Sequence, residues 1–311
     1  MNSQPAADRP PLWKLICAYL ILYIVWGSTF LAIRFTVETI PPLMSGGIRF
    51  FAAGAILLAA RAFHNRGTGL KVSARSWALA LRASLLPFVI SYGIITAAEQ
   101  YVPSYAAGLI IALEPLWFCL LGWLFFGGKR PTARNYAGIA LGFAGMCVLM
   151  GGDWREVSLT SGYTMWMFLL LLSTLAWVGG AFISADPRIS SDTLTSSGLQ
   201  MFCGGVVLIT LQYIYSAFTG EWPHFGAFSM KSALAVAYLV IFGSLAAYSA
   251  FLWLMRVEPA SRVSTHGFVN PVIAVILGVV LGGEELHTGT LIALPLVVAS
   301  VALMISSSSS Q

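Results

Sequence analysis

The stretch GIRFFAAG at residues 47–54 recurs in altered form as GLQMFCGG at residues 198–205. The same spacing of 151 residues pairs Trp26 with Trp177. From residue 92 onward the spacing becomes 156, a five-residue change that a loop can absorb. The further pairs are Tyr92/Tyr248, Pro103/Pro259, Pro115/Pro271, Gly122/Gly278, Gly127/Gly283 and Thr132/Thr288. Matches that keep their order over this distance indicate two similar halves, which we place at residues 1–152 and 153–311.

The composition of both halves is that of a membrane protein. Of the 311 residues, 58% are hydrophobic and only 9% are charged. Soluble domains carry about 25% charged residues, so this chain cannot cover a water-facing surface. We therefore expect an all-α, polytopic membrane protein.

Ten membrane spans are predicted from the apolar runs. Each run approaches or exceeds the ~20 residues that cross a bilayer. Five runs lack Asp, Glu, Lys and Arg, and five more contain one or two such residues. The uncharged runs are Leu15–Ile33, Val157–Ala185, Thr193–Gly220, Ser232–Met255 and Val263–Gly283, and the others lie near residues 39–60, 76–98, 103–127, 135–152 and 287–306. The first run is too long for the apolar part of a signal peptide and has no small-x-small cleavage site after it.

The basic residues orient these spans. With the N-terminus inside, most Lys and Arg residues fall on the inner side, and only Arg155 and Lys231 lie in outer loops. This asymmetry predicts that both termini are cytoplasmic. It also explains the net charge of +5 without nucleic-acid binding. Two halves of five spans each must then have opposite orientations, which is typical of secondary transporters with a central substrate site.

Several motifs resemble the drug/metabolite transporter superfamily, and specifically its EamA type. They are WGSTFLAIRF in the first span, Pro-Pro-Leu before GIRFFAAG, the Glu-Pro and Asn-Pro dipeptides, and GGEELHTG after the ninth span. The resemblance covers roughly residues 14–305. It implies a ten-helix exporter, made of two similar five-helix halves, that moves amino acids, other small metabolites or drug-like compounds by alternating access. One departure is visible, because Gly128-Lys129 replaces the Gly-Glu pair that the second half retains as Gly283-Glu284.

Glu114 and Pro115 lie in the middle of an apolar span. Glu114 is about twelve residues, or ~18 Å, from the outer end of its span. A carboxylate at this depth is costly and suggests a proton-binding or amine-binding group, although a structural pair with an arginine fits equally. Pro115 removes a helix hydrogen bond, so we expect a helix break that faces the protein interior.

The second half places Asn270 and Pro271 at the equivalent positions, with His266 one turn earlier. Pro271 predicts a second helix break. His266 is a group that titrates near neutral pH, but a histidine hydrogen-bonded quietly between helices is the plainer interpretation.

Arg49 is paired by the repeat with the neutral Gln200. Three interpretations remain open for Arg49: a contact to a substrate carboxylate, a structural pair with Glu114, and a side chain that snorkels to the outer surface. Both residues are candidates for the cavity.

Aromatic residues deep in their spans complete the predicted cavity. Tyr92, Thr96 and Glu99 follow one face of the third span, with Glu99 near its outer end, where water can reach it. Cavity lining and helix packing both fit the remaining aromatic residues, which are Trp26, Trp117, Trp177 and Tyr248. Among the glycines, Gly47 and Gly198 are candidates for hinges or helix breaks, whereas Gly138, Gly142, Gly145, Gly278 and Gly282 indicate close helix packing.

The sequence lacks the marks of other functions. It contains no GxSxG or HExxH motif, and GGKRPT is not a phosphate-binding loop, so neither an enzyme nor an ATP-driven pump is expected. No cofactor or metal is expected. The expected partners are a small-molecule substrate, the lipid bilayer and protons, and one copy of the chain is expected to suffice. A channel-like facilitator and an uptake carrier remain as alternatives.

Overall fold

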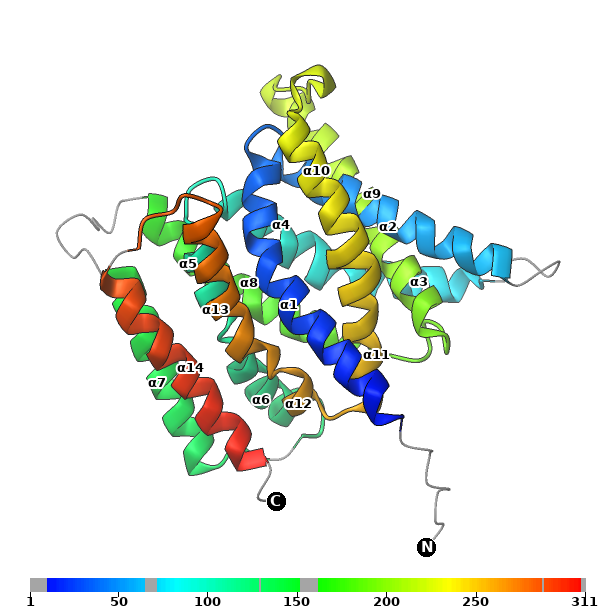
Figure 1. Ribbon diagram of the computed structural model, residues 1–311. Coiled ribbons are helices and arrows are strands. Elements are labelled where there is room, and N and C mark those ends of the chain that lie inside the picture. Colours follow the sequence, from blue (N-terminus) through cyan, green and yellow to red (C-terminus); the bar gives the residue numbers. More distant parts are fainter. Residues whose placement is uncertain (1–9, 65–71, 129, 152–161, 287, 309–311) are drawn as a thin grey trace, which may run out of the picture.

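The computed structural model describes residues 10–64, 72–128, 130–151, 162–286 and 288–308. Within these ranges the chain is helical and contains no β-strand. Figure 1 shows the helices packed side by side, with the start of α1 and the end of α14 at the same end of the molecule. Lys129 and the predicted boundary between the halves, at residues 152 and 153, lie outside the described residues.

The elements follow one another with short connections. In chain order they are α1 (Leu12–Val37), α2 (Pro42–His64), α3 (Ala74–Ser84), the π-helix η1 (Leu85–Ser91), α4 (Tyr92–Ala98), α5 (Ser104–Ile111), α6 (Glu114–Phe125), α7 (Ala133–Gly151), α8 (Gly162–Ser184), α9 (Thr193–Thr219), the 3₁₀-helix η2 (Phe225–Ala227), α10 (Met230–Tyr238), the π-helix η3 (Leu239–Tyr248), α11 (Ser249–Val257), α12 (Ala260–Val263), α13 (His266–Val280) and α14 (Thr288–Ser308).

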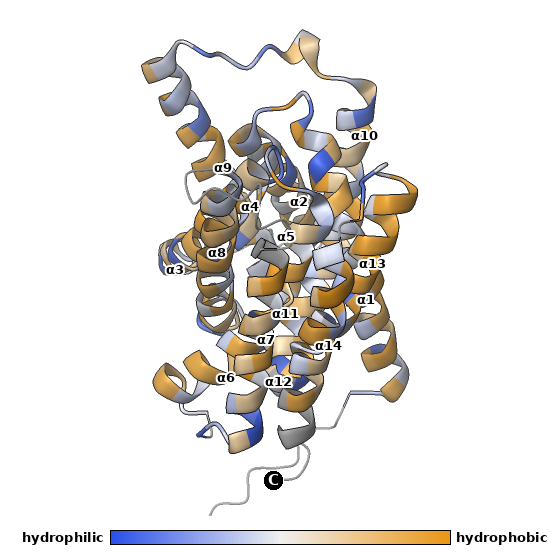
Figure 2. Ribbon diagram, turned by 90° about the vertical axis from the view of Figure 1, so that its left-hand side faces the viewer, coloured by the Kyte–Doolittle hydropathy of each residue, from blue (hydrophilic) through white to orange (hydrophobic). Residues whose placement is uncertain are grey.

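Seven helical segments of the described chain are long and apolar enough to cross a membrane. Three of the seven combine consecutive elements: α3-η1-α4, α5-α6 and α10-η3-α11. The other three predicted spans form α7, α13 and α14, which are not among the seven. α13 has 15 residues, or roughly 22 Å at 1.5 Å per residue, because it begins only after a break. Figure 2 shows mostly hydrophobic helices, with hydrophilic residues gathered near their ends.

Two spans contain π-helical segments that the sequence did not predict. η1 and η3 occupy matching places in the two halves, since Tyr92 follows η1 and Tyr248 ends η3. The Tyr92 N–H bonds to the Pro87 carbonyl, five residues back, as in a π-helix. Such wide turns shift the side chains that follow them around the helix, and they are frequent at functional sites.

Two other spans are broken. The first break, at Ala112 and Leu113 between α5 and α6, directly precedes Glu114 and Pro115, as predicted. The prediction for Pro271 is wrong: α13 runs through this proline, and the break lies at Ser264 and Thr265, between α12 and α13. The two breaks are close in space, because a Cβ on Gly267 would lie 2.9 Å from the Pro115 ring.

The two octapeptides of the repeat pack against each other. A Cβ on Gly54 would lie 2.3 Å from the Phe202 nitrogen, and one on Gly205 would lie 2.2 Å from the Phe51 nitrogen. Only glycine permits so close a crossing of α2 and α9. Gly47 and Gly198 belong to the same crossing and lie within unbroken helices, so neither is a helix break. Their predicted role as hinges remains a prediction.

The remaining contacts exchange partners between the halves. α1 packs against α10, η3 and α13, whereas α8 packs against η1, α4, α5 and α6. α7 packs along α14, and Gly142 there leaves room for the Ser300 hydroxyl, as its predicted packing role requires. The largest buried cluster lies where α1, α2, α8 and the two π-helical spans meet.

Polar contacts connect the halves at one end of the molecule. This end lies opposite the one that holds the start of α1 and the end of α14. Lys231 pairs with Glu38 at 2.6 Å across the halves. Within the first half, Arg34 donates to the Glu99 carbonyl at the same end. The Glu284 carboxylate accepts hydrogen bonds from the Ser104 N–H at 2.9 Å and from the Ser104 hydroxyl at 3.0 Å, capping α5. Glu284 therefore joins the loop after α13 to the start of α5.

A second cross-link joins α2 to the start of α9. Asp192 caps α9 through the Thr195 N–H at 2.9 Å and pairs with Arg61 at 2.8 Å. Burial raises the pKa of Asp192, but the hydrogen bonds from Thr195 and the Arg61 charge more than offset this effect, so that the pKa lies below its usual value.

Candidate functional site

A cavity of about 80 Å³ lies between the two halves. Both halves supply its walls, which include both π-helices and the starts of α6 and α13. It is smaller than the roughly 300 Å³ of small ligand pockets. Its lining residues are Trp26, Thr29, Phe30, Ile33, Arg49, Phe50, Pro87, Phe88, Ser91, Tyr92, Ile95, Ile111, Glu114, Trp177, Gly243, Tyr248, His266 and Asn270.

Glu114 and His266 meet across the cavity. Each begins a helix directly after a break, Glu114 in α6 and His266 in α13. The His266 Nε2 lies 3.2 Å from the Glu114 Oε2, and both side chains are almost completely buried. The breaks place both residues at helix N-termini, where the backbone dipole stabilises a negative carboxylate.

The hydrogen bonds of His266 define the protonation of this pair. Its Nδ1 lies 2.9 Å from the Val263 carbonyl oxygen, which can only accept, so Nδ1 carries a proton. A neutral imidazole then has no proton on Nε2. The contact with Glu114 therefore requires one further proton, either on His266 or on Glu114. The geometry thus allows the pair to share one proton.

Asn270 and Trp26 support His266. The Asn270 amide faces the carbonyls of Tyr23 at 2.9 Å and His266 at 3.3 Å, so its nitrogen is assigned to this side. The Trp26 ring lies edge-on to His266, with ring centroids 5.4 Å apart. Trp26 Nε1 also donates to the Gly243 carbonyl at 3.3 Å. Trp26 therefore connects the proton-binding pair to η3.

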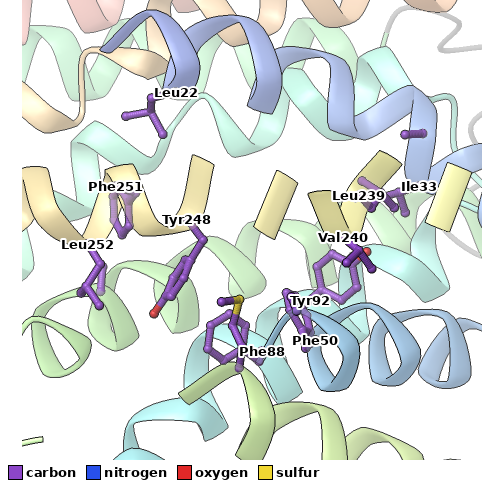
Figure 3. Close-up of a cluster of buried hydrophobic side chains, with 14 of the residues drawn as sticks. Leu22, Ile33, Phe50, Phe88, Tyr92, Leu239, Val240, Tyr248, Phe251 and Leu252 are labelled. Atoms are coloured by element: carbon purple, nitrogen blue, oxygen red, sulfur yellow. The ribbon is translucent and has the colours of Figure 1, made fainter. Parts of the chain in front are cut away.

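Aromatic rings form one wall of the cavity. Tyr92, Phe50, Phe88 and Tyr248 contact one another in that order, with successive ring centroids 4.7, 4.6 and 5.0 Å apart. Figure 3 shows these four rings gathered in the buried cluster, with Phe251 nearby. Trp177 lies against Trp26 at 5.4 Å, from the other half. Such a wall favours flat or apolar ligands.

Arg49 also reaches the cavity. Its side chain is only 5% exposed, so it does not snorkel to the surface. Its Nε donates to the Ser244 hydroxyl in η3 at 2.8 Å, and its guanidinium lies 4.9 Å from the ring centroids of both Phe50 and Tyr92. Glu114 pairs with His266 instead, so the predicted alternative of an Arg49–Glu114 pair is wrong.

Three predicted cavity residues lie elsewhere. Trp117 Nε1 donates to the Thr174 hydroxyl at 2.6 Å, which is helix packing between α6 and α8. Gln200 lies behind the cavity wall, where its oxygen accepts from the Tyr248 hydroxyl at 3.1 Å. Glu99 is completely buried near the end of α4, so the expectation that water reaches it is wrong.

Several lining residues were not predicted, among them Phe88 and Gly243, and neither was Ser244, which accepts the hydrogen bond of Arg49. Their signal was present in the repeat, because the spacing of 156 that pairs Tyr92 with Tyr248 also pairs Phe88 with Ser244. These positions lie one helical turn before the tyrosines. The sequence comparison missed these positions because the two paired residues, phenylalanine and serine, are dissimilar.

Apolar spans on all sides and a polar, aromatic cavity between them define a multi-pass membrane protein with a central site. The chain belongs to the EamA-like transporter family, which matches residues 13–151 and, a second time, residues 164–306. This confirms the resemblance identified from the sequence motifs. The chain is a multi-pass protein of the inner membrane.

Relatives with similar lengths are named as transporters. The chain is 35% identical to the inner membrane transporter YedA of Escherichia coli K12, over 94% of this chain and 91% of YedA. It is 25% identical to the transporter YvbV of Bacillus subtilis, over 96% of this chain and 92% of YvbV. One solved crystal structure matches 94% of this chain and 96% of its own length, with a TM-score of 0.66 at 21% identity, which shows a shared fold. Membrane transport is therefore the supported activity.

Proposed function

We propose that this chain is a secondary transporter that exports small metabolites, in particular amino acids including aromatic ones, or drug-like compounds. The observation that carries this proposal is the cavity between the halves, where His266 Nε2 lies 3.2 Å from Glu114 Oε2 next to an aromatic wall. No enzymatic step is needed for such a function. Protons are the proposed coupling ion, since the pair can gain and lose a proton as the cavity changes its access.

The proposed architecture is ten helices in two inverted halves, residues 1–152 and 153–311, with both termini cytoplasmic. Three observations support it. The family matches once in each half, the π-helices occupy matching places, and α1 and α8 exchange partners between the halves. Two halves that rock against each other across α2–α9 and α7–α14 would expose the cavity to each side in turn.

Flux measurements with the purified chain in proteoliposomes test this function. Vesicles loaded with labelled amino acids, aromatic acids or cationic drugs are expected to release at least one class faster than protein-free vesicles do. The release is expected to accelerate with an imposed proton gradient. Absence of flux for every class would overturn the proposal, and conductance without saturation would favour a channel-like facilitator. Uptake driven by the physiological gradient would favour an uptake carrier.

A further inference from the structure

Arg49 is a buried charge, because the residue is only 5% exposed. None of the ion pairs formed by the described residues involves Arg49. Only its Nε has a described hydrogen-bond acceptor, the Ser244 hydroxyl. Burying an unpaired charge is costly, and buried charges are normally paired. Apart from the Ser244 hydroxyl and the rings of Phe50 and Tyr92, the guanidinium is therefore open to an anionic ligand.

The neighbouring polar groups favour the same kind of ligand. The Ser91 hydroxyl and the Tyr92 hydroxyl line the cavity, are buried and lack hydrogen-bond partners among the described residues. The Tyr92 hydroxyl lies near the guanidinium without a hydrogen bond of normal geometry to it. Both hydroxyls and the guanidinium can donate to one acceptor group. A carboxylate, with two oxygens and about four lone-pair sites, satisfies such a donor set, whereas an ammonium group does not.

The backbone of η3 is shaped to hold Arg49 at this place. A Cβ on Gly243 would lie 2.8 Å from the Arg49 Nη2, so a larger residue there would displace the guanidinium from this position. The next residue, Ser244, orients Nε. Gln200, the repeat equivalent of Arg49, is instead satisfied within its own half by Ser184 and Ser196. The charged site therefore belongs to one half only.

We propose that Arg49 binds the carboxylate of the transported compound, whose flat apolar body lies along the rings of Phe50, Phe88 and Tyr248. The substrate class is thus an aromatic or similarly flat organic acid. An amino group is not required, because Glu114 is already engaged by His266. The assignment of this group as a transport substrate rests on the proposed function, but binding of the anion does not.

Four indole compounds distinguish the contribution of a carboxylate from that of an amine. Indole-3-propionate carries only the carboxylate, and tryptophan carries both groups. Tryptamine carries only the amine, and indole-3-propionamide carries neither. Binding is measured by the shift of thermal unfolding of the purified, detergent-solubilised chain. The two carboxylates are expected to bind roughly 10- to 100-fold more tightly than the amide, as charge-assisted hydrogen bonds imply. Equal affinity of the two carboxylates would show that the amine contributes nothing. Tighter binding of tryptophan would add an amine contact to the same anion site.

Arg49→Gln places the residue of the other half at this position. It is expected to abolish the preference for the carboxylates while leaving amide binding within about twofold. Arg75→Gln removes the same charge at an exposed position and is the matched control. Arg49→Lys keeps the charge without the planar fork, and is expected to retain part of the preference if the glutamine variant does not fold.

Tightest binding by tryptamine, or an equal loss of acid and amide binding in Arg49→Gln, would overturn the anion site. Failure of the transport function has a different signature. Carboxylates would then stabilise the protein in an Arg49-dependent manner, yet none would cross the membrane in proteoliposomes. That result would uphold the anion site and remove the proposed transport.

Discussion

The contact between Glu114 and His266 depends on both helix breaks. Each residue starts a helix after a break in its span, and the two breaks lie against each other through Pro115 and Gly267. The carbonyl of Val263 fixes the tautomer of His266, so the shared proton lies between Nε2 and the carboxylate. At this scale the proposed chemistry is the gain and loss of one proton.

Glu114→Gln tests that chemistry while preserving the contact. The glutamine amide can donate to the unprotonated Nε2, so the geometry persists without an acid that titrates. We expect the flux of the variant to lose its dependence on pH, because no carboxyl group remains there to gain and lose a proton. Glu285→Gln, the same change at an exposed position, is the control. Flux of the Glu114 variant that follows pH as in the unmodified chain would exclude Glu114 as a proton carrier.

At the scale of elements, the crossing of α2 and α9 depends on backbone contact. Gly54→Ala or Gly205→Ala would place a methyl group within 2.3 Å of a backbone nitrogen on the opposing helix. Because backbone cannot move as a flexible side chain does, we expect each variant to lose about 1–3 kcal/mol of stability. Thermal unfolding measures the loss, with Gly226→Ala as the control, since nothing lies within 4 Å of a Cβ there. An unfolding temperature equal to that of the control would contradict the crossing.

Much of this element-level structure was predictable. Glycines that recur in both halves indicate the faces where helices pack closely, and polar residues deep in apolar spans indicate functional positions because burying them is costly. Trp26, Tyr92, Glu114, Trp177, Tyr248, His266 and Asn270 all line the cavity, and their role in substrate binding stays a prediction. The π-helices were not predictable, since the apolar composition of Leu85–Ser91 fits an α-helix equally. The position of the second break was also missed, because α13 accommodates Pro271 near its start while the chain breaks six residues earlier.

At the scale of the whole molecule, polar contacts hold the halves together at one end. This is the end opposite the start of α1 and the end of α14. Glu284 bridges the halves there through Ser104, and Glu38 does so through Lys231. Under alternating access this end must open in one state of the cycle, which breaks these hydrogen bonds. The small cavity volume fits a state in which the contacts are made.

Glu284→Ala is therefore expected to favour opening at this end. A cysteine introduced at Ile95, on the cavity wall, should react several-fold faster with an impermeant maleimide added to that side of oriented vesicles. Three hydrogen-bond donors, the Ser104 N–H and hydroxyl and the Tyr105 N–H, lose their acceptor in the variant. Glu285→Ala, the exposed neighbour, should leave the rate unchanged. An equal rate in both variants would show that Glu284 does not restrain this end.

The central claim is that the halves carry substrate across the membrane by alternating access around the cavity. Counterflow tests it most directly: proteoliposomes loaded with unlabelled aromatic acid are diluted into labelled acid, and the label inside is followed with time. We predict a transient accumulation of label above its external concentration, saturable in substrate and abolished by Arg49→Gln. Label that equilibrates without overshoot, together with ionic conductance, would contradict a carrier and show an open pore.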